Sequence, residues 1–247
     1  MSTDVDYDVE KTDGVHPGKP VVVDRYTPWA RVNHWITAAS LVLLALSGLA
    51  MFHPSLFFLS GLFGGGQFTR FIHPWIGVLL FFSFLGLFLR FWTANLWKRD
   101  DSNWLAHGRD VLAGHEERAP EVGKYNAGQK LVFWSMSILI IVLIATGLVI
   151  WDQYFSAYTT IGQKRWAVLL HAIAAVVIIN VWIIHVYSAI WVRGTIRAMT
   201  RGSVTGGWAW RHHRKWLREL VAGSPARSTP KSTPKSTNEK SGRTPAE

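Results

Sequence analysis

The sequence predicts an all-α integral membrane protein, a bundle of four transmembrane helices with both termini in the cytoplasm and further helices at the membrane surface. Hydrophobic residues make up 49% of the 247 residues and charged residues only 17%, against about 25% in an ordinary globular domain. Four long stretches contain no Asp, Glu, Lys or Arg. Because about 20 apolar helical residues cross the hydrocarbon layer of a bilayer, each stretch is long enough to span it.

Three parts are expected along the chain. Residues 1–24 are polar and predicted to be mobile. Residues 222–247 repeat STPK and lack large apolar side chains, so they cannot offset the entropy lost on ordering and are predicted to be disordered. Residues 25–221 are predicted to form the membrane domain, with spans at about 33–53, 73–92, 131–151 and 167–192.

The basic residues predict the orientation of the spans. Of the 26 Lys and Arg residues, 23 lie before the first span, between Arg90 and Lys130, or after the fourth span. By the positive-inside rule, both termini and the 93–130 loop face the cytoplasm. The net charge of +10 therefore reflects topology and contact with anionic membrane lipids, and no nucleic-acid partner is expected.

Three segments outside the spans combine apolar side chains with helix signals. The loop 54–72 is too apolar for solvent and predicts a short surface helix that ends at the glycine run 64–66. Residues 102–118 predict an amphipathic interfacial helix. Residues 208–220 mix tryptophan with basic residues, which is also an interfacial pattern.

Four of the ten histidines, His34, His73, His171 and His185, lie in or at the ends of the spans. A titratable side chain in a membrane is expected to be paired or to bind a ligand, because leaving it alone in hydrocarbon is costly. The other six lie in loops or tails and are expected to be ordinary surface or interfacial residues: His16, His53, His107, His115, His212 and His213.

Spacing and topology decide which of the four can meet. His171 and His185 are fourteen residues apart, so they face the same way about 21 Å apart along one helix. With the predicted orientation, His73 and His171 lie near the outer face and form an outer pair. His34 and His185 lie near the cytoplasmic face and form an inner pair.

Each pair offers two imidazoles, and the chain has no cysteine. Two protein ligands are too few for zinc, whereas a porphyrin brings four nitrogens of its own. Two histidines then complete the six-coordinate iron of a b-type haem, which transfers electrons, and a c-type haem is excluded because no CxxCH motif is present. Gly48 lies fourteen residues after His34, at the level of the outer pair, where a haem edge needs room; helix packing explains it equally well.

The apolar stretches contain no Asp or Glu that could relay protons through the bilayer. Electrons are therefore a better expectation than ions or solutes as the transported species. The alternative from another functional class is a haem-free membrane anchor or transport protein whose histidines bridge helices.

Several segments match a known family: DRYTPWARVNHW (24–35), RFIHPW (70–75), VGKYNAGQK (122–130), LLHAIA (169–174) and IIHVYSAIWVRGTIRAM (183–199). Over residues 20–220 the chain resembles the gamma, or cytochrome b, subunit of membrane-bound respiratory formate dehydrogenase. The cytochrome b subunits of hydrogenases and thiosulfate reductases share the four-histidine scaffold and are the nearest alternative. VGKYNAGQK is the most specific piece and argues against them.

The resemblance implies two haem b groups, held by His73 with His171 and by His34 with His185. It also implies a quinone site at the inner haem, formed by Asn126 and Gln129 near His185; the alternative for those two residues is ordinary helix capping at the start of the third span. Weaker candidates for the quinone site are Lys124, Tyr125 and Lys130.

The same resemblance implies partner subunits, a substrate and a location for the chain. Formate would be oxidised in an external alpha subunit with a molybdenum or tungsten pterin, and electrons would arrive through an iron–sulfur beta subunit. Menaquinone or ubiquinone would be reduced at the cytoplasmic side of the bacterial inner membrane, within a trimer of heterotrimers. No catalytic residue of formate oxidation is expected in this chain.

Overall fold

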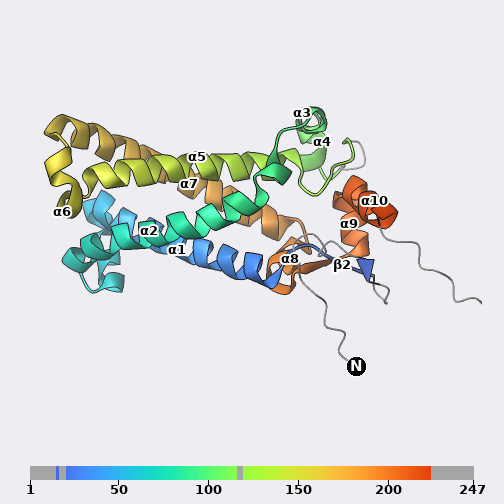
Figure 1. Ribbon diagram of the computed structural model, residues 1–247, viewed down its shortest axis with the longest axis horizontal. Coiled ribbons are helices and arrows are strands. Elements are labelled where there is room, and N and C mark those ends of the chain that lie inside the picture. Colours follow the sequence, from blue (N-terminus) through green and yellow to red (C-terminus); the bar gives the residue numbers. More distant parts are fainter. Residues whose placement is uncertain (1–14, 17–20, 116–118, 224–247) are drawn as a thin grey trace, which may run out of the picture.

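The structure is a computed structural model that describes residues 15–16, 21–115 and 119–223. The first fourteen residues and the STPK-rich tail from residue 224 lie outside the described residues, so the expectations for them are not addressed by the structure. The described part is mostly helical, and its long helices lie side by side along the long axis of the molecule (Figure 1).

Four helices are long and apolar enough to cross a membrane, which confirms the predicted number of spans. They are α1 (Pro28–Phe52), α2 (Gly66–Phe91), α5 (Ala127–Ile150) and α7 (Ile161–Trp191). Each begins a few residues earlier than its hydropathy predicts. Three of them begin after an N-cap residue whose side-chain oxygen accepts a hydrogen bond from a backbone N–H of the first turn. These N-cap residues are Thr27, Asn126 and Thr160.

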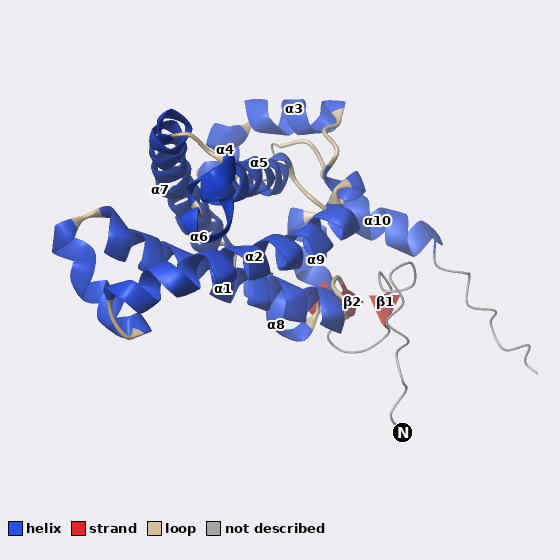
Figure 2. Ribbon diagram, turned by 60° about the vertical axis from the view of Figure 1, so that its left-hand side comes forward, coloured by secondary structure: helices blue, strands red, loops and turns tan. Residues whose placement is uncertain are grey.

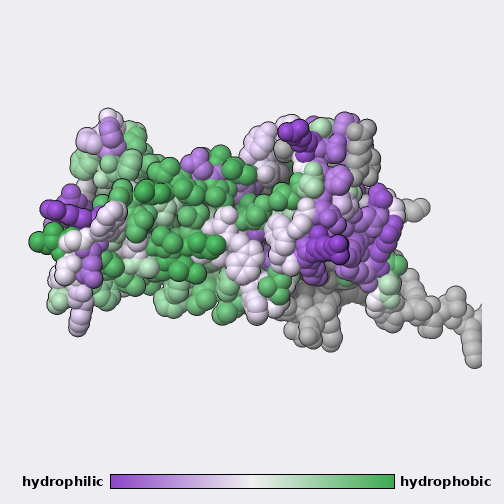
Figure 3. Space-filling view, turned by 90° about the horizontal axis from the view of Figure 1, so that it is seen from above, coloured by the Kyte–Doolittle hydropathy of each residue, from purple (hydrophilic) through white to green (hydrophobic). Residues whose placement is uncertain are grey.

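The bundle consists of two helix pairs, because α1 packs mainly against α2 and α5 mainly against α7. Each helix contributes one buried residue to a central apolar cluster, namely Leu41, Leu80, Ile140 and Ile178. The outer surface of the bundle is apolar along its length, and polar side chains gather at the end where α3, α9 and α10 lie (Figure 3). This pattern fits a protein that lies in a bilayer with a large polar cap on one side.

The end of the bundle opposite this cap carries short connections. The expected helix after the first span is a 3₁₀ helix, η1 (Pro54–Phe63), and it ends at Gly64, whose φ of 79° favours glycine. The helices α6 (Asp152–Phe155) and η4 (Ser156–Tyr158) connect α5 to α7.

The connection between α2 and α5 differs from the expected single helix over 102–118. It contains a 3₁₀ turn, η2 (Thr93–Asn95), and two short helices, α3 (Arg99–Ala106) and α4 (Gly108–Leu112). The chain turns at His107, between α3 and α4, and Gly108 then opens α4. Glycine weakens the continuation of a helix, which explains the break.

A small sheet that the sequence analysis did not predict lies beside the C-terminal helices (Figure 2). Its antiparallel strands are β1 (Val15–His16), β2 (Val22–Asp24) and β3 (Ser203–Thr205), with Val23 opposite Val204. The end of the N-terminal segment that we expected to be mobile is thus packed, because Val23 is fully buried. Such short strands carry too little alternation to be read from sequence.

The residues after α7 form α8 (Thr195–Arg201), α9 (Gly206–His212) and α10 (Arg214–Gly223). Trp208 and Trp216 are buried in one cluster with Val23 and Val204. Both tryptophans were expected in an interfacial segment; the structure shows that their side chains are buried and form the core of a small cap at one end of the bundle.

Candidate functional site

The four histidines of the spans lie in two facing pairs. The ring centres of His73 on α2 and His171 on α7 are 6.3 Å apart, and those of His34 on α1 and His185 on α7 are also 6.3 Å apart. Helix α7 thus carries one member of each pair, and α1 and α2 supply the partners. Ile178, in the central apolar cluster, is seven residues from both histidines of α7 and lies between the two levels.

The separation within each pair fits two imidazoles on opposite sides of one metal. An imidazole nitrogen binds a metal at about 2.0–2.1 Å and the ring centre lies about 1 Å behind it, so two ring centres across one metal are roughly 6 to 6.5 Å apart. Within the described residues, no group of three or more His, Asp or Glu side chains could hold a metal by itself. The two-imidazole donor set therefore suits iron whose other ligands come from a porphyrin.

Two hydroxyl groups orient the rings of the outer pair. Ser47 Oγ lies 2.7 Å from His73 Nδ1 and also donates to the Leu43 carbonyl at 2.7 Å. Because the hydroxyl has one proton, which goes to that carbonyl, His73 Nδ1–H donates to Ser47 and Nε2 keeps the lone pair for a metal. Thr146 Oγ1 on α5 repeats this arrangement, 2.9 Å from His171 Nδ1 and donating to the Val142 carbonyl at 2.6 Å.

A glycine follows each hydroxyl residue and lies against the same ring. A Cβ atom on Gly48 would lie 3.5 Å from His73 Cε1, and one on Gly147 would lie 3.5 Å from His171 Cε1. The outer pair is thus held by the same dipeptide pattern, Ser–Gly on α1 and Thr–Gly on α5. The spacing from His34 predicts Gly48 at this level, whereas Ser47, Thr146 and Gly147 were not predicted. A hydroxyl residue followed by glycine in two different spans is the signal that could have found them.

The inner pair is held differently. His34 Nδ1 is buried and has no hydrogen-bond partner in the part of the chain that the structure describes. A buried ring nitrogen without a partner is costly, and no hydroxyl among the described residues orients the His34 ring as Ser47 and Thr146 orient the rings of the outer pair. The edge of the neighbouring Trp35 ring packs against His34, with centres 5.5 Å apart.

We expect Ser47→Ala to weaken retention of a haem at the outer pair by about 10- to 100-fold, because it removes the hydrogen bond that orients a metal ligand. Haem transfer from the purified protein to apomyoglobin measures this loss. Ser137→Ala is the matched control: Ser137 is equally buried on α5, and its hydroxyl donates to the Phe133 carbonyl at 2.7 Å. Equal haem loss from the two variants would show that Ser47 acts only through helix packing.

Asn126 and Gln129 form a reciprocal cap at the start of α5. Asn126 Oδ1 accepts from Gln129 N at 2.9 Å, and Gln129 Oε1 accepts from Asn126 N at 3.1 Å. Helix capping thus accounts for the side-chain oxygens of both residues. The two side-chain NH₂ groups take no part in these capping hydrogen bonds. Both residues also line a cavity of about 1570 Å³ that reaches His185. The structure therefore brings Asn126, Gln129 and His185 to one cavity.

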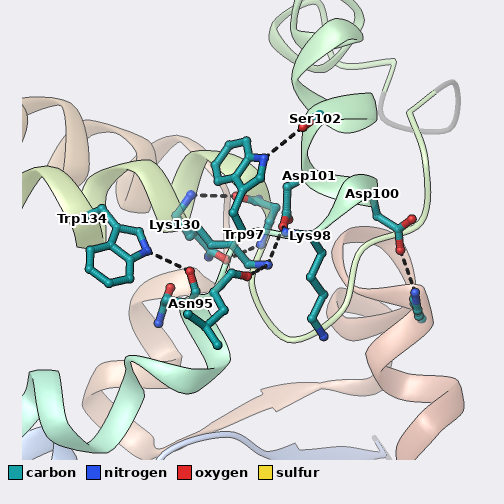
Figure 4. A network of polar contacts seen from close by, with 12 residues as sticks. Asn95, Trp97, Lys98, Asp100, Asp101, Ser102, Lys130 and Trp134 are labelled. Atoms are coloured by element: carbon teal, nitrogen blue, oxygen red, sulfur yellow. Dashed lines mark hydrogen bonds and ion pairs between the residues drawn. The ribbon is translucent and has the colours of Figure 1, made fainter.

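A buried ion pair holds α5 beside this cavity (Figure 4). Lys130 Nζ lies 2.7 Å from Asp101 Oδ2 of α3, and each side chain is only 5% exposed. Lys130 also donates to the Leu96 carbonyl at 3.1 Å, and Lys98 N donates to Asp101 at 2.6 Å. Trp134 adds a hydrogen bond to the Asn95 carbonyl at 2.9 Å. Lys130, which the sequence offered as a weaker candidate for the quinone site, therefore has its ammonium group engaged in holding the start of α5 against α3.

Of the six histidines expected at the surface, His213 departs from that expectation. Its side chain is buried, with an exposed fraction of 1%. His213 lies between α9 and α10 and lines the same cavity as Asn126. Burial, and then the charge of Arg25, hold the pKa of His213 well below its usual value, so the imidazole is neutral.

Known proteins are similar to this chain in sequence. The chain matches the prokaryotic cytochrome b561 family over residues 25–202. It is 43% identical to the formate dehydrogenase cytochrome b556(fdo) subunit of Escherichia coli over 79% of this chain and 92% of that protein. The chain belongs to the formate dehydrogenase cytochrome b556 subunits. It is also 40% identical to the nitrate-inducible cytochrome b556(Fdn) subunit of Escherichia coli, over 77% and 88% of the two chains. The identity is 38% with the cytochrome b556 subunit of Haemophilus influenzae, over 81% and 84%.

Membership in the cytochrome b556 subunits decides between the alternatives that the sequence left open. A cytochrome b holds haem b, so a haem-free anchor no longer fits the chain. The donor set agrees with the family, because the structure offers paired imidazoles and no thiolate for a haem.

Proposed function

We propose that this chain carries electrons across the membrane within a formate dehydrogenase complex and delivers them to quinone. His73 and His171 would hold one haem b, and His34 and His185 a second. The observation that carries the proposal is the repetition of one ring separation, 6.3 Å, at two levels of the same helix α7. When bound, the two haem groups supply one-electron transfer, and the chain supplies their ligands and spacing.

The two histidine pairs have different surroundings. At the outer pair, Ser47 and Thr146 accept hydrogen bonds from the Nδ1–H groups of the two histidines and so orient both rings. At the inner pair, His185 lies at the wall of the large cavity. The inner level is therefore the one from which electrons can pass to a diffusible acceptor.

Quinone is the proposed occupant of that cavity. Asn126 and Gln129 present amide groups to it from the first turn of α5. Their NH₂ groups would donate hydrogen bonds to a quinone oxygen and stabilise the charge that develops there during reduction. His185 would face both the inner haem and the quinone. Menaquinone and ubiquinone both present such an oxygen.

The proposed partners are those that the family resemblance implies, and the proposed direction rests on the charge pattern of the loops. We propose that an iron–sulfur subunit and a molybdenum or tungsten pterin subunit on the outer side supply electrons to the outer pair, and that the cap of α8–α10 faces the cytoplasm. The proposed setting is the bacterial inner membrane, with a trimer of heterotrimers as the assembly. Each electron that moves inward conserves about 2.3 kcal/mol per 100 mV of membrane potential.

Difference spectroscopy on the purified complex tests the proposal. We expect a reduced b-type α band with formate as well as with dithionite, two haem b groups per chain by the pyridine haemochrome assay, and reoxidation of the band when a soluble quinone analogue is added. A complex in which formate reduces no haem, or which binds a single haem per chain, would contradict the proposed path.

A further inference from the structure

The loop that leads into the quinone site is held by two residues from opposite ends of the chain. Gly123 and Lys124 precede Asn126, and their backbone carbonyls accept hydrogen bonds from His213 and Arg25, respectively. Arg25 follows β2 near the N-terminus and His213 joins α9 to α10 near the C-terminus. Three segments far apart in the sequence thus meet immediately before the cap of α5.

Arg25 is fixed more firmly than an ordinary surface arginine. Its exposed fraction is 3%, and its backbone nitrogen donates to the Gly202 carbonyl at 2.8 Å. The guanidinium carbon lies 4.8 Å from the ring centre of Trp216 and 5.1 Å from that of Trp208. Tyr125, within the loop itself, contributes a third ring at 5.6 Å. Cation–π contacts with desolvated rings stabilise the charge at this position.

The proton positions on His213 follow from its partners. Nδ1 lies 2.8 Å from the Gly123 carbonyl oxygen, which can only accept, so Nδ1 carries the proton. Nε2 lies 3.4 Å from Arg25 Nη2, which can only donate, so Nε2 is the acceptor. A single neutral tautomer satisfies both contacts, and it links the two residues that hold the loop.

We propose that Arg25 and His213 are positioning residues for quinone reduction, acting together as a clamp on the 123–124 backbone that sets where Asn126 presents its amide to the cavity. This inference rests on the proposed quinone site. His213 lines the same cavity as Asn126, Gln129 and His185, so the clamp lies beside the site that it would set. The clamp also gives the C-terminal helices a part in the reaction, because His213 joins α9 to α10 and these helices carry its neighbours Trp208 and Trp216.

Two conservative variants of His213 separate positioning from general packing. An asparagine places its amide nitrogen near the former Nδ1 and can still donate to the Gly123 carbonyl. A glutamine places its amide nearer the former Nε2 and loses this bond. Both are polar and smaller than histidine, so a merely structural role predicts similar effects.

The readout is steady-state quinone reduction by the intact complex with formate and decylubiquinone, together with haem content and the extent of haem reduction by formate. We expect His213→Gln to raise KM for the quinone by about threefold to tenfold, the effect of one lost hydrogen bond, and His213→Asn to stay within about twofold of the wild type. Haem content and formate-dependent haem reduction should be unchanged in both.

Equal KM values in the two variants would overturn the clamp, and so would loss of haem from either of them, because His213 would then support the fold in general. Failure of the proposed function gives a different result, since the wild-type complex would then reduce its haem with formate but not reduce the quinone, or not reduce haem at all.

Discussion

Replacing His34 by alanine is expected to remove one of two haem b groups and to leave the other in place. His34 belongs only to the inner pair, with the ring centre of His185 at 6.3 Å, and the outer pair is built on other residues of α1, α2, α5 and α7. A six-coordinate haem that loses one of two protein ligands loses its anchor on that side. Pyridine haemochrome analysis should fall from two groups to one per chain, and quinone reduction should be lost because the proposed inner level supplies it.

A second variant and a control make this result specific. His73→Ala should also leave one haem, but here formate should no longer reduce the haem that remains, because the proposed entry level is missing. His107→Ala is the control, since His107 lies outside the spans and its ring contacts the Asn103 carbonyl. Two haem groups retained in His34→Ala would refute the pairing.

Breaking the buried ion pair at the start of α5 is expected to cost about 3–5 kcal/mol in the free energy of unfolding. Lys130→Met leaves Asp101 buried with an unpaired charge, because both side chains are 5% exposed and Lys98 N is the other hydrogen-bond donor to Asp101 Oδ2 among the described residues. A detergent-solubilised complex should therefore lose its helical signal at a lower temperature by circular dichroism. The loop that includes α3 should also become sensitive to protease.

The double variant Lys130→Met with Asp101→Leu tests the cause. Replacing both charges by apolar side chains of similar size removes the desolvation cost along with the attraction, so most of the lost stability should return. The exposed pair formed by Lys215 and Asp100, 2.7 Å apart, is the matched control. Breaking it should change stability little, because water screens exposed charges. A double variant as unstable as Lys130→Met would show that Lys130 acts through packing.

The spans and the histidine pairs could be predicted because each depends on long-range regularities of the sequence. Charge-free stretches locate four helices, and the fourteen-residue spacing of His171 and His185 with an alternating topology leaves one way to pair four histidines. The residues that orient the rings were not predicted. Ser47 and Thr146 contact histidines of neighbouring helices, and such contacts depend on how each helix is rotated in the bundle.

The cap formed by α8, α9, α10 and the small sheet was the least predictable part. Tryptophan among arginines is equally typical of a membrane interface and of a buried cation–π core. Only tertiary packing, with Arg25 between Trp208 and Trp216, decides for the second. The sheet that completes the cap consists of strands of two or three residues, at 15–16, 22–24 and 203–205. Strands this short, from opposite ends of the chain, carry too little sequence pattern for their pairing to be predicted.

The central cluster of Leu41, Leu80, Ile140 and Ile178 has a consequence for energy conservation. A layer of four aliphatic side chains gives water no hydrogen-bonding partner, so a hydrated path for protons is interrupted midway between the histidine levels. An electron needs no such path and can tunnel through packed hydrocarbon. The bundle would therefore let electrons cross between the two histidine levels while it blocks the passage of protons. Both properties are needed for electron transfer to maintain a membrane potential.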